Sequence, residues 1–133
     1  GALVIKKKGK KLSLQMTEMT CKLSDREKEV SDVEEKVVEE IPLTSSKIWL
    51  RIDADFSPGQ GTGMRRMGGA DCANFYYSLD GEQWTKIGTE NYRLGFDWRR
   101  FFMGTKFGLF CYATKKAGGY VDIDEFCYDK AAK

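Results

Sequence analysis

An alternation of side chains in the closing stretch, residues 101–128, constrains most strongly what this chain can fold into. Two runs alternate with period two: Phe107, Leu109 and Cys111 with Gly108, Phe110 and Tyr112, then Val121 and Ile123 with Asp122 and Asp124. This period is typical of strands that present two distinct faces. The Lys-Lys-Ala-Gly-Gly sequence between the runs is typical of a turn. We therefore predict two closing strands of a β-sandwich, whose function lies on a sheet face or edge.

Residues 47–56 form the clearest strand pattern in the chain. One face of this strand would carry Trp49, Arg51, Asp53 and Asp55, and the opposite face Ile48, Leu50, Ile52, Ala54 and Phe56. Two hairpins are also predicted, one joining 3–5 to 11–19 around Gly9 and one joining 75–79 to 84–87 around Asp80 and Gly81. A mixed loop is expected over 88–100. Roughly eight or nine strands at this spacing predict an all-β fold, an antiparallel β-sandwich.

Residues 20–40 allow two interpretations. Ser24 and Glu27 fit a capping box, and Val30, Val33 and Val37 have helical spacing, which together favour a short helix. The alternative is a loop to about residue 33 and then a strand over 35–43. We prefer the strand, because 36–43 is rich in β-branched residues and its neighbours are strands.

The length and charge of the chain limit its class. The 133 residues are expected to form a single domain, 1–133. The 22 basic and 20 acidic residues are mixed along the chain, which argues against a nucleic-acid partner. The lysine cluster at 6–8 and 10–11 is expected to be a solvated turn. No stretch approaches the roughly 18 apolar residues of a membrane span, so no membrane partner is expected.

Four widely spaced cysteines, and the absence of histidine, argue against a zinc site. We favour free thiols over disulfides, with Cys111 and Cys127 buried in apolar strands. The lack of histidine also removes the commonest general base, so an enzyme is not expected. We expect no cofactor, although calcium stays open.

Two carboxylate pairs and one glycine motif have competing interpretations. Asp53 with Asp55, and Asp122 with Asp124, could be a glycosidase acid and base or calcium ligands. The interpretation we favour is a salt-bridged outer face, with Arg51 as the partner of Asp53. The glycine-rich run 59–63 resembles a phosphate-binding loop, but no helix pattern and no Gly-Lys-Ser/Thr follow it.

Several aromatic side chains could form a binding surface. Trp49, Tyr76 and Tyr112 are expected on strand faces opposite the core, where flat rings could stack on sugar rings. The alternative is that a partner domain covers these faces. Core positions are expected instead for Trp84, Phe75, Phe107 and Phe126.

Three segments carry a family resemblance: KIWLRIDADF, ANFYYSLDGEQWTKIG and FFMGTKFGLFCYATKKAGGYVDIDEFCY. Together they resemble the C-terminal concanavalin-like β-sandwich (a jelly roll) attached to family 43 glycoside hydrolases, which include β-xylosidases and arabinofuranosidases. The resemblance covers most of the chain. The family domain usually has further strands upstream, so some N-terminal strands are expected to be missing, and the loops 20–33 and 57–71 are longer than usual.

The resemblance implies a non-catalytic accessory domain, because the catalytic carboxylates of that family lie in a separate propeller domain. We expect a carbohydrate-binding module of a plant-cell-wall-degrading enzyme, secreted or extracellular, although a cytoplasmic location stays open. The expected partners are xylan, another hemicellulose or a β-glucan, and the catalytic domain of the parent chain. A structural domain that docks on the catalytic domain without binding sugar is the alternative. An open sheet edge would also permit a dimer. The candidate carbohydrate-binding residues are Trp49, Arg51, Asp53, Tyr76 and Tyr112.

Overall fold

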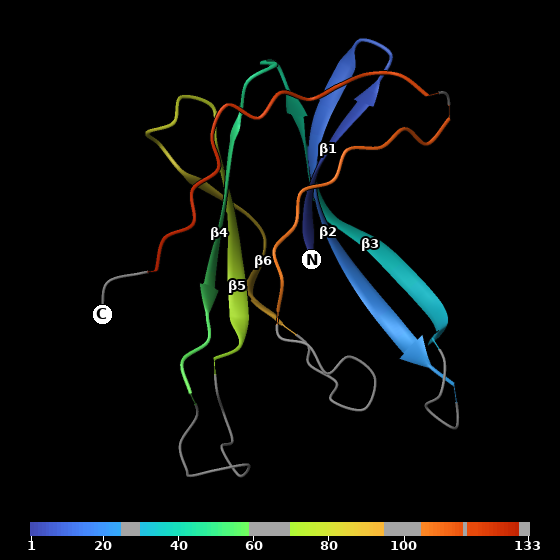
Figure 1. Cartoon of the computed structure of the whole chain (residues 1–133), viewed down its shortest axis with the longest axis vertical. Coiled ribbons are helices and arrows are strands. Elements are labelled where there is room, and N and C mark those ends of the chain that lie inside the picture. Colours follow the sequence, from blue (N-terminus) through green and yellow to red (C-terminus); the bar gives the residue numbers. More distant parts are fainter. Residues whose placement is uncertain (25–29, 59–69, 95–104, 116, 131–133) are drawn as a thin grey trace.

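Six strands in two antiparallel sheets form the fold (Figure 1). The computed structural model describes residues 1–24, 30–58, 70–94, 105–115 and 117–130. Sheet A has the order β1-β2-β3 and sheet B the order β4-β5-β6. The bounds are Ala2–Lys8 for β1, Lys11–Leu23 for β2, Val30–Leu43 for β3, Trp49–Asp55 for β4, Cys72–Ser78 for β5 and Thr85–Arg93 for β6. Within these ranges there is no helix, and so none that could cross a membrane.

The lysine-rich hairpin of sheet A forms as predicted. Strands β1 and β2 pair from Lys8 opposite Lys11 onward, which leaves Gly9 and Lys10 as the turn. Gly9 has a φ of 63°, in the left-handed region that glycine adopts without strain. The lysines around it are exposed, so their charges remain solvated.

Strand β3 replaces the helix that the valine spacing allowed. It begins at Val30, earlier than the predicted residue 35, and pairs with β2 through Val33 opposite Cys21 and Val37 opposite Thr17. The helical interpretation is therefore wrong over 30–37, whereas part of the capping box lies outside the described residues. Antiparallel pairing with β2 gives alternate residues of β3 backbone hydrogen bonds to a neighbouring strand, and a helix would forgo that ladder.

Sheet B contains the Asp80-Gly81 hairpin, with strands longer than predicted. Strand β6 continues to Arg93, so the loop expected over 88–100 begins later than its sequence suggested. The hairpin loop is held by two side chains. Ser78 Oγ donates to Asp80 Oδ1 (2.8 Å) and accepts from the Gly81 N–H (2.9 Å). Asp80 Oδ1 also accepts from the N–H groups of Glu82 and Gln83, both at 2.8 Å.

The core lies between the two sheets. Leu14 and Met16 of β2 are fully buried against Ala73 and Phe75 of β5 and Ile87 of β6. Phe75, predicted as core, is confirmed, and its ring meets Tyr92 edge-on at 5.9 Å between centroids. Burying these side chains supplies most of the stabilisation, because apolar area removed from water contributes roughly 25 cal/mol per Å².

A bulge in β6 joins the two sheets. Residues 88–91 face the single residue Asn74 of β5, because Ala73 pairs with Tyr92 and Phe75 with Ile87. Gly88 in this bulge donates its N–H to Glu39 Oε2 of β3 at 2.8 Å. A Cβ at Gly88 would lie 2.5 Å from Met16 Cγ, and the φ of this residue is +81°. Only glycine allows this close approach of β6 to β2.

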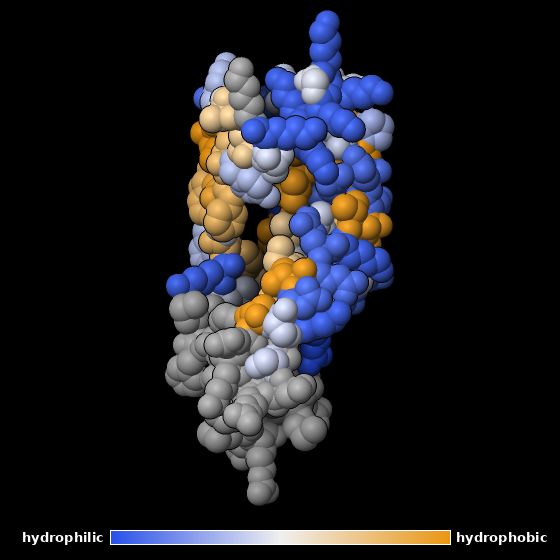
Figure 2. All heavy atoms as spheres, turned by 90° about the vertical axis from the view of Figure 1, so that its right-hand side faces the viewer, coloured by the Kyte–Doolittle hydropathy of each residue, from blue (hydrophilic) through white to orange (hydrophobic). Residues whose placement is uncertain are grey.

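The closing strands are the main correction to the sequence prediction. No strand is assigned within the described residues of 105–130, which we call the C-terminal segment. Phe107 and Phe126, predicted as core, are exposed, and so are Cys111 and Cys127. The segment crosses in front of both sheets in Figure 1. Figure 2 shows hydrophobic residues separated by an opening from a largely hydrophilic layer. Among the described residues the segment is hydrogen-bonded to no strand, and its apolar side chains are not covered, although a stable strand requires both.

The fold class is nevertheless the predicted one. Two antiparallel sheets packed around an apolar core form an all-β sandwich. All four cysteines are free thiols, as predicted.

Candidate functional site

The outer face of sheet B gathers four of the five predicted site residues. Strands β4 and β5 pair with Arg51 opposite Tyr76 and Asp53 opposite Asn74. Because side chains alternate along a strand, Trp49, Arg51 and Asp53 lie on the face opposite the core, together with Tyr76. The strand pattern of 47–56 thus placed these side chains on the correct face.

Arg51 is the centre of this face. Its guanidinium carbon lies 4.5 Å from the centroid of the Tyr76 ring and 4.6 Å from that of Trp84. Its Nε is 3.2 Å from Asp53 Oδ1, an ion pair without the alignment of a hydrogen bond. The predicted pairing of Arg51 with Asp53 is therefore confirmed. A guanidinium over aromatic faces is favourable because the ring quadrupole attracts the cation.

Trp49 lies at the hairpin end of the same face. A Cβ on Gly81 would be 3.1 Å from Trp49 Cε2, so the indole packs directly against the turn. Lys47 Nζ lies 5.1 Å from the centre of the Trp49 ring. Trp49 therefore supports the hairpin loop, and a cation lies over its ring.

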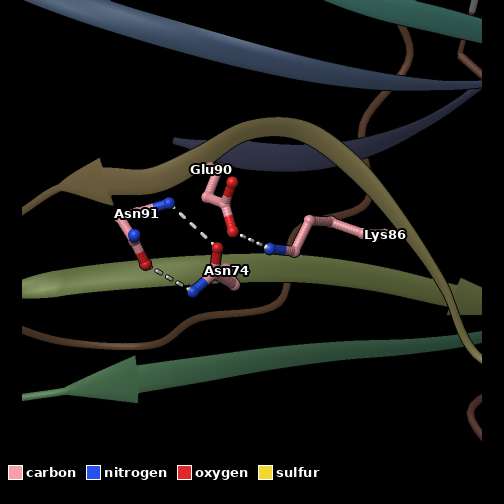
Figure 3. A network of polar contacts seen from close by, with 4 residues as sticks. All are labelled: Asn74, Lys86, Glu90 and Asn91. Atoms are coloured by element: carbon pink, nitrogen blue, oxygen red, sulfur yellow. Dashed lines mark hydrogen bonds and ion pairs between the residues drawn. The ribbon is translucent and has the colours of Figure 1, made fainter.

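The bulge of β6 borders this face with a polar network (Figure 3). Asn74 donates through Nδ2 to Asn91 Oδ1 (3.0 Å), and its Oδ1 accepts from the Asn91 N–H (2.9 Å). Lys86 Nζ donates to Glu90 Oε1 at 2.8 Å. This hydrogen bond raises the pKa of Lys86 and lowers that of Glu90, so both groups stay charged near neutral pH. The network fixes the bulge, and Lys86 Nζ also lies 6.0 Å from the centre of the Tyr76 ring.

The carboxylate pairs are engaged in local contacts. Asp55 Oδ1 accepts from the Ser57 N–H at 2.8 Å, and hydrogen bonding by Ser57 lowers the pKa of Asp55. Asp124 Oδ2 lies 3.2 Å from Lys47 Nζ. Among the described residues, no three His, Cys, Asp or Glu side chains gather as a metal site would require. The glycine-rich run 59–63 lies outside those residues.

A small hollow near the hairpin end is separate from this face. Its volume is about 210 Å³, and it is lined by Tyr77, Ser78, Leu79, Asp80, Gln83 and Thr85. It contains none of the predicted site residues. Its volume is below the roughly 300 Å³ at which ligand pockets begin, so the outer face of sheet B is the better candidate for binding.

Comparison with known protein families matches residues 1–129 to the beta-xylosidase C-terminal concanavalin A-like domain. The chain belongs to this family. It is therefore a β-sandwich accessory domain of family 43 glycoside hydrolases, distinct from their catalytic propeller. No curated protein and no solved structure matches the chain.

Tyr112 is the predicted site residue that this family domain does not bring to the outer face. It lies in the C-terminal segment, 79% exposed, and no ring contact or ion pair among the described residues joins it to the other four. The prediction assumed that 107–112 is a strand whose alternate residues share a sheet face. Without pairing to a neighbour, its alternation assigns no face.

Trp84 is the residue of the outer face that the sequence prediction missed. It was predicted as core, yet its ring contacts Arg51 on the outer face. In the structure Lys86 pairs with Tyr76, and Trp84 precedes Lys86 by two residues, so both share one face if the extended backbone continues to Trp84. The pattern alone could not say which face of β6 was the core.

Three aromatic rings, two cationic side chains and one carboxylate thus line the outer face of sheet B of this accessory domain. They are Trp49, Tyr76, Trp84, Arg51, Lys86 and Asp53. Such a surface can offer flat apolar area beside hydrogen-bond donors and acceptors. That combination suits a ligand with many hydroxyls and apolar ring faces.

Proposed function

We propose that this accessory domain is a non-catalytic carbohydrate-binding module, which binds xylan, another hemicellulose or a β-glucan on the outer face of sheet B. The observation that carries the proposal is the position of Tyr76 and Trp84 around Arg51, which is paired with Asp53, with Trp49 on the same partly exposed strand face. In this role the parent enzyme is secreted and degrades plant cell walls. The module would hold the polysaccharide near the catalytic domain of the parent chain.

The chemistry of Arg51 supports a ligand rich in hydroxyls. Arginine carries five N–H donors, and the contact with Asp53 engages only Nε. The guanidinium is 4.5 Å from Tyr76 and 4.6 Å from Trp84, so the rings hold it in place without consuming its remaining donors. A sugar would receive hydrogen bonds from this fixed donor group and pack its apolar face on the ring surface beside it. No cofactor takes part in this mode of binding.

One observation favours the alternative, a structural accessory domain that docks on the catalytic domain without binding sugar. The predicted platforms are partly occupied, because Arg51 lies over Tyr76 and Trp84, and Lys47 lies over Trp49. Cation–π contacts of this kind also stabilise strand faces that bind nothing. The two proposals differ in one measurable property, the affinity for polysaccharide.

Affinity electrophoresis in native gels that contain soluble xylan or β-glucan separates them. We expect the chain to be retarded in at least one such gel, and retardation to be lost in Tyr76→Ala and Arg51→Gln. Tyr112→Ala is the matched control, because Tyr112 lies in another part of the fold and should bind as the wild type does. EDTA should leave the retardation unchanged.

Two results would decide against the binding module. An unretarded wild-type chain across a polysaccharide panel would favour the docking domain. Loss of retardation in Tyr112→Ala, with Tyr76→Ala unaffected, would move the site to the C-terminal segment. Far-UV circular dichroism of each variant establishes that the sheets are intact. Reducing sugar released by the isolated chain would show that it is catalytic.

A further inference from the structure

The C-terminal segment has the composition of strands but is not paired as one. Among the described residues, neither backbone hydrogen bonds between strands nor those in loops involve it. Its apolar side chains are open to solvent, and Phe110 and Tyr120 are each 87% exposed. Unpaired backbone beside exposed, alternating apolar side chains can add to the edge of a sheet.

Strand β4 offers such an edge. It is the outermost strand of sheet B, and it pairs with β5 on one side only. Leu50 and Ile52 point to the inner face of β4, yet each is 40% exposed. The β5 residues opposite them, Tyr77 and Phe75, are better covered. The open side of β4 therefore lacks both a backbone partner and apolar cover.

An ion pair already joins the two elements. Lys47 Nζ, just before β4, lies 3.2 Å from Asp124 Oδ2 of the C-terminal segment. In Figure 1 the end of the chain descends beside β4 in the same direction as the β4 arrow. A parallel ladder with Asp124 opposite Lys47 would place Glu125 beside Ile48 and Cys127 beside Leu50. The Glu125 carboxylate would then lie on the inner, apolar face, which is unfavourable. The parallel direction that the segment has beside β4 of its own chain therefore does not suit pairing with β4 in this register.

The antiparallel register with the same ion pair is complementary at four of its five positions, and at the fifth it places Asp122 opposite Trp49. In this register Asp124 lies opposite Lys47, and Ile123 lies opposite Ile48. Val121 lies opposite Leu50, and Tyr120 lies opposite Arg51. Apolar residues then meet on the inner face, while an ion pair and a cation–π pair form on the outer face. We propose that the C-terminal segment of a second copy of this chain adds to the β4 edge in this antiparallel register.

Exchange of the segment would be reciprocal. Each copy would donate its residues 120–124 to β4 of the other, giving an isologous two-fold dimer in which both open edges are paired. The exchange covers Leu50 and gives Val121 and Ile123 an apolar environment. Trp49 and Arg51 are the proposed sugar-binding side chains that this surface includes, and the dimer does not depend on carbohydrate binding.

Cysteine cross-linking between two differently labelled chains tests the register. In a background with all four native cysteines replaced by serine, a chain with Arg51→Cys is mixed with a ¹⁵N-labelled chain with Tyr120→Cys under mild oxidation. Directly opposite Cβ atoms are about 5 Å apart in an antiparallel pair, a separation close to what a disulfide spans. We expect a mixed dimer of twice 15.1 kDa in mass spectra. Lys8→Cys, in the exposed turn of sheet A, replaces Arg51→Cys in the control mixture and should give little of this product.

A second measurement keeps the proposal falsifiable if cysteines perturb the edge. Sedimentation over a dilution series should show a dimer that Val121→Asp with Ile123→Asp weakens at least about tenfold, or about 1.4 kcal/mol. Leu109→Asp, equally exposed but outside the register, should leave it unchanged. A monomer at every concentration, equal cross-linking in the Lys8 control, or an intramolecular link in the Arg51→Cys, Tyr120→Cys double variant would overturn the proposal.

Discussion

Strand β4 and the C-terminal segment have similar sequences and different structures. Both alternate apolar and polar residues, Leu50 and Ile52 in the first and Val121 and Ile123 in the second. Strand β4 pairs along its length with β5, whereas the C-terminal segment is part of neither sheet. The difference teaches that alternation makes a segment competent to be a strand. A neighbouring backbone and a covered face are needed to make it one.

The largest expected effect on stability comes from truncating one leucine in the core and comparing it with one leucine in the C-terminal segment. Leu14→Ala should lower the free energy of unfolding by about 2–5 kcal/mol, because a fully buried side chain leaves a cavity. Leu109→Ala, in the C-terminal segment, should change it by less than about 0.5 kcal/mol. Urea unfolding at one low protein concentration measures both. Similar losses would show that the segment packs into the core.

Two glycines extend the comparison to the backbone. Gly88→Ala should cost about 2–4 kcal/mol, since its Cβ would lie 2.5 Å from Met16 Cγ at a φ of +81°. Gly118 also has a positive φ, +137°, but nothing lies within 4 Å of its Cβ position. Gly118→Ala should therefore cost only the strain of this backbone conformation, about 1–2 kcal/mol, and less than Gly88→Ala, which adds a steric clash. Equal effects on the unfolding midpoint would contradict the close approach of β6 to β2.

A smaller loss of stability is expected for a variant of the hairpin loop between β5 and β6. Ser78→Ala should destabilise the chain by about 1–3 kcal/mol, because the buried hydroxyl bonds both Asp80 and Gly81. Ser31→Ala removes an exposed hydroxyl that donates to the Lys22 carbonyl at the open end of sheet A, and should be close to neutral. Thermal unfolding of the two variants provides the measurement. A neutral Ser78→Ala would mean that the loop does not need this anchor.

Low pH should destabilise the same hairpin loop between β5 and β6. Hydrogen bonds from the Gln83 and Glu82 N–H groups lower the pKa of Asp80 below its ordinary 3.8. A carboxyl with a lowered folded pKa contributes stability above its unfolded pKa, and that contribution is lost as the pH falls through the folded value. Stability should thus decline below about pH 3.8 in the wild type, and Asp80→Asn should flatten this part of the pH profile. An unchanged acid limb in Asp80→Asn would assign the decline to other carboxyls.

The smallest expected effect concerns the contact between the two compared regions. Lys47→Ala removes the ion pair with Asp124, whose side chains are both more than half exposed. Exposed pairs contribute little, so the free energy of unfolding should stay within about 0.5 kcal/mol of wild type. A clearly larger loss in urea unfolding would show that the segment is fastened to β4 within one chain.

Much of the candidate site could be predicted, because a paired strand keeps its two faces apart. The alternation in 47–56 was enough to group Trp49, Arg51 and Asp53, and the register with β5 added Tyr76. The predicted strand-face position of Tyr112 and the predicted core position of Trp84 were wrong for one shared reason. Which face of an element is the core depends on what packs against it, and neither residue carries that information in its own neighbours.

The sequence by itself determined the strand-forming segments, the turns at Gly9 and Gly81, and the family, because these depend on local backbone preference and on side-chain order. The tertiary structure alone decided the bulge at residues 88–91, the cation–π contacts of Arg51 with Tyr76 and Trp84, and the unpaired state of the C-terminal segment. Each of these depends on which backbone comes to lie beside another. Pairing between distant segments is a property of the whole fold, so no local pattern can state it.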